Sequence, residues 1–351
     1  MTARSETPTR SRMRPRSRTA TVTVLSAVVV LVVAVIAVAI GSTTLPIGDV
    51  MRALVGAADP TQQFIVLTFR LPRVVCALLV GACLGLAGAL TQTFSRNPLA
   101  TPDILGVTSG AAVGAVVTIV IGGGGYAVGA SLLGFGIPVV ATVFGLATSA
   151  VVYGLSWRGG VDSYRLILIG IGATAALTGV TSYLLVQAQI TQASAAAHWL
   201  AGSLAGISWT SIWPVLVVLV VVAPIAAAQS PALEVSGLGD DLSVGLGVAL
   251  QRHRLIVIAC AVVLTSAAVS ASGPVDFVAF VAPQVAARLA RRGRPPLAAS
   301  ALLGASLVVI ADLVGRAVFP WEVPVGIITA IVGAPYLIWL ITRHRSQEGT
   351  S

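Results

Sequence analysis

Uninterrupted apolar stretches of about 20 residues recur along the whole chain, and they constrain its fold more than any other feature. A helix of this length crosses a ~30 Å hydrocarbon core, whereas a membrane β-barrel would show alternating segments of about ten residues. Only 9% of the 351 residues are charged and 56% are hydrophobic, while soluble domains carry about a quarter charged residues. The sequence therefore predicts an all-α integral membrane protein.

Ten transmembrane helices are predicted from the hydrophobic runs and the glycines and prolines between them. The eighth run is short for a full crossing, but Gly273–Pro274 and residues 293–296 bracket it as a separate apolar segment. The predicted spans are about 20–41, 74–94, 104–121, 134–156, 164–187, 209–228, 253–272, 277–290, 298–317 and 324–342. We expect one domain over residues 20–343, a basic disordered tail at 1–19 and a second tail at 344–351.

The basic residues are distributed unevenly between the two faces of the predicted bundle. All 21 are arginines, and seventeen of them fall in the two tails and in the loops on the same side as the tails. Because cytoplasmic segments carry the excess of positive charge, both termini are predicted in the cytoplasm, across the plasma membrane. Topology thus explains the net charge of +9 without nucleic acid. The four outward arginines are Arg52, Arg70, Arg73 and Arg316.

Arg70 and Arg73 stand on either side of Leu71–Pro72 at the start of the second span. Snorkelling to lipid phosphates accounts for a single arginine at such a position. Here the proline at the helix start fixes the direction of the pair, and Arg316 lies at the outer end of another span. An acidic external partner explains the three arginines as well as lipid does, and both explanations stay open at this point.

A cytoplasmic segment over residues 238–247 has the pattern of a short amphipathic helix. Leu238, Leu242 and Leu246 are spaced at i, i+4 and i+8, with Asp240 and Asp241 near the start. Helices that lie in lipid headgroups favour basic polar faces. The two aspartates therefore favour a soluble partner as the occupant of this surface.

The sequence argues against several kinds of chemistry. Without lysine it has neither a P-loop nor a Schiff base, and HExxH and GxSxG are absent, so we expect no catalytic and no metal site. Cys76, Cys83 and Cys260 fall within apolar spans and are predicted to pack there. Asp312 is the strongest intramembrane carboxylate, and an i, i+4 pair with Arg316 is its simplest explanation, which counts against an ion-coupled carrier.

Small residues and helix breakers supply the remaining structural signals. Glycines at close spacing predict close helix contacts, and for most of them the expected contact is packing within the bundle. They are Gly81, Gly85 and Gly88; Gly106, Gly110 and Gly114; and Gly170, Gly172 and Gly179. Between the second and third spans, Asn97–Pro98 and Pro102 predict a tight cytoplasmic turn, with Asp103 placed to cap the next helix.

Taken together, these motifs resemble the permease subunits of the iron-siderophore, haem and vitamin B12 class of ABC importers. The resemblance covers about residues 47–343, and its order and spacing leave chance similarity negligible. It is carried by RLPR at 70–73, RNPLATPDILGVTSGA at 96–111, WLAGSL at 199–204, LGDDLSVGLG at 238–247, GPVDFVAFVAPQVAARL at 273–289 and ADLVGRAVFPWEVPVGIITAIVGAPYLIWL at 311–340.

The resemblance implies a type II importer permease that pairs with a second permease subunit, alike or different. It also implies two cytoplasmic ATPases, which use ATP and magnesium, and an external substrate-binding protein; this chain itself would bind no cofactor. Glutamates of the binding protein would meet Arg70, Arg73 and Arg316. The segment 238–247 would be the coupling helix, with Leu238, Gly239, Asp240, Asp241, Leu242, Leu246 and Gly247 at the ATPase.

Further residues match positions that the family uses in its structure or its pathway. The structural positions are Asn97, Pro98, Pro102, Gly106, Gly110, Pro283, Asp312, Glu322, Pro324, Gly326 and Pro335. The pathway positions are Gly170, Thr174 and Thr329.

The chain also departs from the family pattern at three positions. Gln284 stands where the family usually has a histidine, and Ala279 stands where it usually has a glycine. Asp276 occupies a position at which the family usually has an uncharged residue. We interpret Asp276 as an idle loop charge. The resemblance favours a ferric siderophore as substrate, with haem or vitamin B12 as alternative substrates. An ion-coupled secondary carrier is the alternative hypothesis from a different class of transporter.

Overall fold

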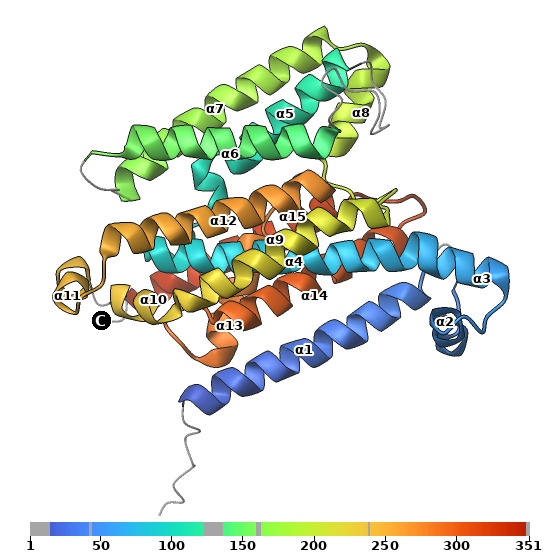
Figure 1. The fold of residues 1–351 in the computed structure, drawn as a ribbon, viewed down its shortest axis with the longest axis horizontal. Coiled ribbons are helices and arrows are strands. Elements are labelled where there is room, and N and C mark those ends of the chain that lie inside the picture. Colours follow the sequence, from blue (N-terminus) through green and yellow to red (C-terminus); the bar gives the residue numbers. More distant parts are fainter. Residues whose placement is uncertain (1–14, 42–43, 123–135, 159–162, 238, 349–351) are drawn as a thin grey trace, which may run out of the picture.

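The ten predicted spans all coincide with helices in the computed structural model, which describes residues 15–41, 44–122, 136–158, 163–237 and 239–348 (Figure 1). The described residues form no β-strand. The ten helices are α1 (Pro15–Ala39), α4 (Leu71–Ser95), α5 (Val107–Ile121), α6 (Ile137–Ser156), α7 (Ser163–Gln187), α9 (Trp209–Ala228), α12 (Leu250–Ser272), α13 (Val278–Ala290), α14 (Leu297–Ala317) and α15 (Val325–Glu348).

Seven of the described helices are long and apolar enough to cross a membrane, and α5, α13 and the apolar part of α15 are shorter. Helix α1 begins at Pro15 and so includes the last five residues of the predicted basic tail, and α15 runs past the predicted end of the domain. Helix periodicity therefore continues at both ends into residues whose charge suggested tails.

Seven short elements connect the spans, and sequence analysis anticipated only the one near residue 240. They are α2 (Ile47–Leu54), α3 (Pro60–Phe64), the π-helix η1 (Ile65–Arg70), the 3₁₀-helix η2 (Pro102–Leu105), α8 (Ile190–Leu200), α10 (Ser230–Ser236) and α11 (Asp240–Gly245). Elements of one to three turns give too few residues for a clear hydrophobic period. Helices α3, η1 and α4 follow one another without a break, so one long rod occupies residues 60–95.

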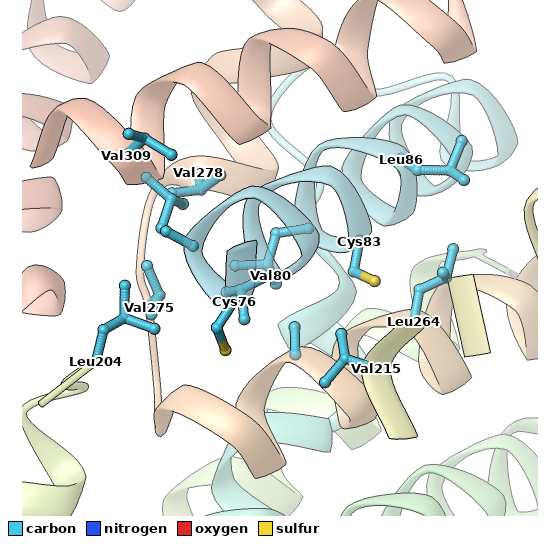
Figure 2. Packing of buried hydrophobic residues seen from close by; sticks show 14 of the residues in the cluster. Cys76, Val80, Cys83, Leu86, Leu204, Val215, Leu264, Val275, Val278 and Val309 are labelled. Atoms are coloured by element: carbon cyan, nitrogen blue, oxygen red, sulfur yellow. The ribbon is translucent and has the colours of Figure 1, made fainter. Parts of the chain in front are cut away.

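Helix α4 forms the centre of the larger group of helices. Within its most apolar stretch 78% of the residues are buried inside the chain, against 11% for α7. The three cysteines are buried and unbonded, as their positions in apolar spans predicted. In Figure 2 the central packing joins side chains of α4, the 201–208 loop, α9, α12, the 273–277 segment, α13 and α14: Cys76, Val80, Cys83, Leu86, Leu204, Val215, Leu264, Val275, Val278 and Val309.

The glycines of α4 let its backbone touch two neighbouring helices. A Cβ atom at Gly81 would overlap the carbonyl of Gly304, and one at Gly85 would overlap the carbonyl of Ser300, both in α14. A Cβ atom at Gly88 would overlap the Ala279 carbonyl in α13. These contacts confirm the predicted small-residue packing, since lipid provides no hydrophobic drive for helix association.

The glycines of α7 behave differently from those of α4. Gly170 packs against the carbonyl of Ile104, but added side-chain atoms at Gly172 and Gly179 would meet nothing within 4 Å. These two glycines therefore make no close contact within the described part of the chain. They lie on the face of α7 that this chain leaves exposed.

Two short segments between the long helices lie alongside the interior of other long helices. Residue Ile104 contacts Gly170, seven residues or about 10 Å from the start of α7. Phe277 contacts Gly333, eight residues or about 12 Å into α15. The loop around Pro102, predicted as a tight turn at the membrane surface, therefore enters the depth of the bundle. Such backbone is tolerated only where protein or a water-filled cavity surrounds it.

Candidate functional site

Charged side chains gather at both ends of α4, and we name the two ends by their central residues. At the Arg73 end, α1 and α14 finish and α4 begins (right in Figure 1). At the Asp240 end, α4 finishes, α12 begins and α10 and α11 lie beside them (left in Figure 1). The predicted docking residues belong to the first end and the predicted coupling segment to the second.

At the Arg73 end, Arg73 is held by two carboxylates. Its Nε donates to Asp312 Oδ1 at 2.9 Å and its Nη2 donates to the same oxygen at 2.7 Å. Nη2 also lies 2.6 Å from Oε1 of Glu322, in the loop between α14 and α15. The Asp312 side chain is 2% exposed and that of Glu322 is 45% exposed, so one partner is buried and the other is accessible.

Arg316 also pairs with Asp312, its Nε lying 3.2 Å from Oδ2. This confirms the i, i+4 pair that the sequence predicts. The pair is only part of a larger arrangement, because Asp312 is shared with Arg73 on α4. Two guanidinium groups around one buried carboxylate satisfy its charge and join α4 to α14.

The last turn of α1 is capped by two of the arginines that are predicted to face outward. Arg70 Nη1 donates to the carbonyl oxygens of Val38 and Ala39 at 3.0 and 2.9 Å. Arg316 donates to the carbonyl oxygens of Ala37 and Ile40. Helix ends leave such carbonyls without intrahelical partners, and their partial negative charge favours cations. The two arginines thereby tie α1 to α4 and α14.

All three predicted docking residues therefore make strong contacts within the chain. Arg70 is buried, and the side chains of Arg73 and Arg316 are only 16% and 10% exposed. Sequence analysis missed the capping of α1, because nothing local connects an arginine with carbonyl groups more than 30 residues earlier in the chain. Docking of an external partner at these arginines stays a prediction.

At the Asp240 end, one carboxylate joins two long helices. Asp240 accepts hydrogen bonds from Arg96, which ends α4, and from Nη2 of Arg254 in the first turn of α12, the latter at 2.8 Å. Arg96 Nε also donates to the carbonyl of Ser236 in α10 at 3.1 Å. We call Arg96, Asp240 and Arg254 the Asp240 clamp.

The two arginines change the acidity of the clamp. Burial alone would raise the pKa of Asp240, but the hydrogen bonds and charges of Arg96 and Arg254 outweigh it and hold that pKa below its ordinary value. Asp240 is therefore ionised over the whole physiological range.

The coupling segment is shorter than predicted. Leu238 lies outside the described residues, and α11 occupies only Asp240–Gly245 of the predicted 238–247. Gly239 and Gly247 have φ values of 112° and 82°, which favour glycine and break the helix at both ends. Leu242 and Leu246 are 62% and 64% exposed, so the apolar side chains remain available to a partner. Asp241 is exposed as well.

Gln284, in place of the family's histidine, joins three elements near the same end. Its Nε2 donates to Oε1 of Gln92 at 2.8 Å and to the carbonyl of Pro98 at 3.1 Å. Gln92 in turn donates to the carbonyl of Phe280 at 3.1 Å. The amide therefore links α13 to α4 and to the loop that carries Asn97, so this departure from the family pattern keeps a structural role.

The loop after α4 differs in one detail from its prediction. Asn97 Oδ1 accepts from the backbone N–H of Leu99 at 2.9 Å, as expected in a turn. Pro102 begins η2, and Gly106, with φ of 68°, both ends η2 and precedes α5. Asp103 accepts from the hydroxyl of Thr108 in the first turn of α5, but Gly106 rather than Asp103 occupies the N-cap position of that helix.

Asp276 occupies the second segment at membrane depth. It is exposed, directly before Phe277, and it interacts electrostatically with Asp103 on the opposite segment. Its neighbour Phe277 packs on Gly333, inside α15.

Several family-motif residues meet at the Arg73 end of α12 and α15. Gly326 N donates to the carbonyl of Gly202 at 3.1 Å, and Ser203 N donates to the carbonyl of Ser272 at 2.7 Å. A Cβ atom at Gly202 would overlap the Pro274 carbonyl. Three segments far apart in the sequence thus pack backbone on backbone.

The remaining motif residues lie within helices or next to them. Pro324 directly precedes α15, and Gly110 packs its backbone on α6. Pro283 and Pro335 lie inside α13 and α15. Each of these prolines removes a backbone donor from its helix, which is tolerated where neighbouring helices satisfy the freed carbonyl.

The three residues predicted to line a pathway are not grouped on one exposed face. Thr329 is buried and donates to the carbonyl of Gly326 at 3.0 Å, and Gly170 is buried against Ile104. Thr174 is partly buried beside Gly106. The exposed apolar residues of α7 and α15 include Ile171 and Ile331, so a pathway role for the predicted three stays a prediction.

Among the residues that the structure describes, no group of three or more histidine, cysteine and acidic side chains is placed to hold a metal ion. The candidate features described above are two charged helix ends and the exposed faces of α7, α11 and α15.

Comparison with known proteins shows similarity over nearly the whole chain. The FecCD transport family model matches residues 29–343. The ferric enterobactin transport system permease protein FepG of Escherichia coli is 39% identical over 309 residues, which cover 88% of this chain and 91% of FepG. The achromobactin transport system permease protein CbrC of Dickeya dadantii is 38% identical, with 87% of this chain and 86% of CbrC covered.

A solved structure supports the same fold. The chain is similar to a metal-chelate type ABC transporter in an inward-facing conformation, with a TM-score of 0.81 and 29% identity. The similarity covers 92% of this chain and 99% of that one.

Proposed function

The chain belongs to the FecCD transport family, and from that premise we propose that it is the permease subunit of an ATP-driven importer for ferric siderophores. The observation that carries the proposal is similarity along almost the full length to permeases whose names specify iron-siderophore transport. The substrate class follows from those relatives, while the multi-pass helical fold makes the chain a membrane transport component.

We infer that the Arg73 end faces outward across the plasma membrane and that both termini lie in the cytoplasm. The arginine distribution supports this orientation, because the Asp240 end carries most of the basic residues in its loops. The Arg73 end would then receive a substrate-binding protein, with acidic groups that meet Arg70, Arg73 and Arg316. Charge-assisted contacts of this kind favour register and rate of encounter.

At the Asp240 end, α11 and its flanking residues would contact an ATPase subunit. The exposed leucines of the segment suit a cleft in a soluble partner. Two ATPases would bind ATP and magnesium, so this chain needs no cofactor of its own. Because the Asp240 clamp joins the segment to α4 and α12, a movement of the ATPases would reach both helices directly.

A second permease subunit would complete the pathway. The exposed apolar faces of α7 and α15 support this arrangement, since such large apolar surfaces face lipid or another subunit in a membrane protein. Alternate opening of the shared space towards the two ends would carry the substrate through without a change to its covalent bonds.

Uptake of labelled iron tests the proposal. Iron-starved cells that lack the gene would be given several ferric siderophores, and each would be compared with cells that carry the wild-type gene or Arg73→Glu. We expect uptake of at least one siderophore to depend on the wild-type gene and to stay low with Arg73→Glu. Unchanged iron uptake together with a loss of haem or cobalamin uptake would show that the substrate is wrong. Uptake that survives loss of the ATPase but collapses with the membrane potential would contradict ATP-driven import.

A further inference from the structure

The three outward arginines of the docking prediction are not equivalent. Arg70 and Arg316 each donate to two carbonyl oxygens of the last turn of α1. If either arginine turned towards an external partner, carbonyl oxygens of this turn would lose hydrogen-bond donors, although Ala39 O would keep the backbone N–H of Leu45. Arg73 contacts carboxylates instead, and it is the one of the three whose contact can be exchanged for a similar one.

The two carboxylates on Arg73 differ in how easily they can be replaced. Asp312 is 2% exposed and is shared with Arg316, so its removal would leave two guanidinium groups without their buried counter-ion. Glu322 is 45% exposed, and an ion pair of that kind contributes little to stability because water screens it. An external carboxylate can therefore replace Glu322 but not Asp312.

The loop that carries Glu322 is held in place at its base and is open at its tip. Val323 N donates to the carbonyl of Gly315 at 3.0 Å, which returns the chain to the last turn of α14. Before Glu322, the side chains of Val318 and Trp321 are 67% and 70% exposed. Tryptophan is enriched in protein interfaces. A partner seated on this loop would reach the Arg73–Glu322 pair from outside.

We propose that Glu322 is an internal competitor for Arg73, and that docking of the binding protein exchanges it for a carboxylate of that protein. The inference rests on the proposed function, because it assumes that a binding protein docks at the Arg73 end. The permease is then held in a resting state in which its docking arginine is occupied. The exchange leaves the number of ion pairs unchanged, so docking is selective for an acidic partner and stays reversible.

The test is binding of the importer's own substrate-binding protein to the intact transporter in lipid nanodiscs, measured as association rate and dissociation constant. Glu322→Asp keeps the charge but shortens the side chain by one methylene and so weakens its pair with Arg73. Glu322→Gln removes the charge. Asp49→Asn is the matched control, since Asp49 lies at the same end in an ion pair with Arg52 at 2.8 Å, outside the arginine cluster.

We expect both Glu322 variants to lower the dissociation constant by about two- to fivefold, the size of one partly exposed ion pair. Asp49→Asn should leave it unchanged, and high salt should reduce the differences. An effect of Glu322→Gln that Asp49→Asn reproduces and Glu322→Asp lacks would mean long-range charge steering, and the exchange would be wrong. The same holds if neither Glu322 variant changes binding.

Arg73→Glu separates this inference from the proposal on which it rests. If Arg73→Glu abolishes binding while the Glu322 variants bind like wild type, docking at Arg73 stands and only the exchange is overturned. If Arg73→Glu binds normally, docking at this residue is wrong and the exchange is wrong with it. Melting temperatures of all variants, measured in the same nanodiscs, show whether each is folded.

Discussion

Arg73 at one end of α4 pairs with a carboxylate that is 2% exposed, whereas Arg96 at the other end pairs with one that is 45% exposed. Both clusters use two arginines around one aspartate, and both join α4 to another long helix. The buried cluster joins α1, α4 and α14, while the exposed clamp holds the segment that we propose contacts an ATPase. Under that proposal, similar charges serve stability at one end and transmission of movement at the other.

Removing the buried aspartate should have the largest effect on stability. Asp312→Asn leaves the guanidinium groups of Arg73 and Arg316 without their shared counter-ion, so we expect a loss of about 3–5 kcal/mol in the free energy of unfolding. Unfolding in mild detergent, followed by tryptophan fluorescence, measures it. Asp49→Asn, in an exposed pair, should lose less than about 1 kcal/mol, and equal losses for the two variants would contradict the comparison.

The close contact between α4 and α13 should have the next largest effect on the free energy of unfolding. In Gly88→Ala the new methyl group overlaps the Ala279 carbonyl, so α4 and α13 must separate, at a cost of about 1–3 kcal/mol. Gly172→Ala is the matched control, because its methyl group would enter open space on α7. The same unfolding measurement applies, and a stable Gly88→Ala protein would mean that the two helices are less tightly packed than described.

A change in the Asp240 clamp should affect transport more than it affects the free energy of unfolding. Asp240→Asn should change the free energy of unfolding by less than about 1 kcal/mol, because two of its three members are partly exposed. We expect transport to fall several-fold, since the coupling segment loses its connection to α4 and α12. ATP-dependent uptake into proteoliposomes that contain the whole importer measures this.

Asp241→Asn is the control for that variant, because Asp241 forms no ion pair in the described part of the chain and its side chain is exposed. If both variants transport equally well, the clamp does not transmit movement. A large loss of stability in Asp240→Asn would mean that the clamp is a structural cluster like the one around Asp312.

The smallest expected effect is the pH dependence of the clamp. Arg96 and Arg254 lower the pKa of Asp240, so the clamp stabilises the protein fully above the unfolded pKa of about 3.9 and loses that contribution as pH falls through the lower folded value. The difference in melting temperature between wild type and Asp240→Asn should thus be constant near neutral pH and disappear in acid. A difference that grows as the pH falls would have the wrong sign.

Much of the fold was accessible from the sequence because the relevant signals are local. A run of about 20 apolar residues defines a span wherever it occurs, and the ten predicted runs are helices. The i, i+4 pair of Asp312 and Arg316 is also local and was predicted correctly. The coupling segment was found by its leucine spacing, but its length was overestimated, because the backbone at Gly239 and Gly247 breaks the helix.

The contacts between side chains on different helices could not be predicted from the sequence in the same way. Hydropathy does not say that Arg70 reaches the end of α1, or that Arg73 meets Asp312, 239 residues later in the chain. Nor does it reveal that the segments around Pro102 and Phe277 enter the membrane depth, because short polar stretches look alike at the surface and inside a bundle.

The sequence by itself determined that this chain is a helical membrane protein, where its spans lie and which family it resembles. The tertiary structure alone decided which arginine is committed to a buried contact and which has an exposed, replaceable partner. The physical reason is that hydrophobicity and helix period act between neighbours in the chain. Desolvation and ion pairing depend on which groups the fold brings together, and the side chains around Asp312 come from helices far apart in the sequence.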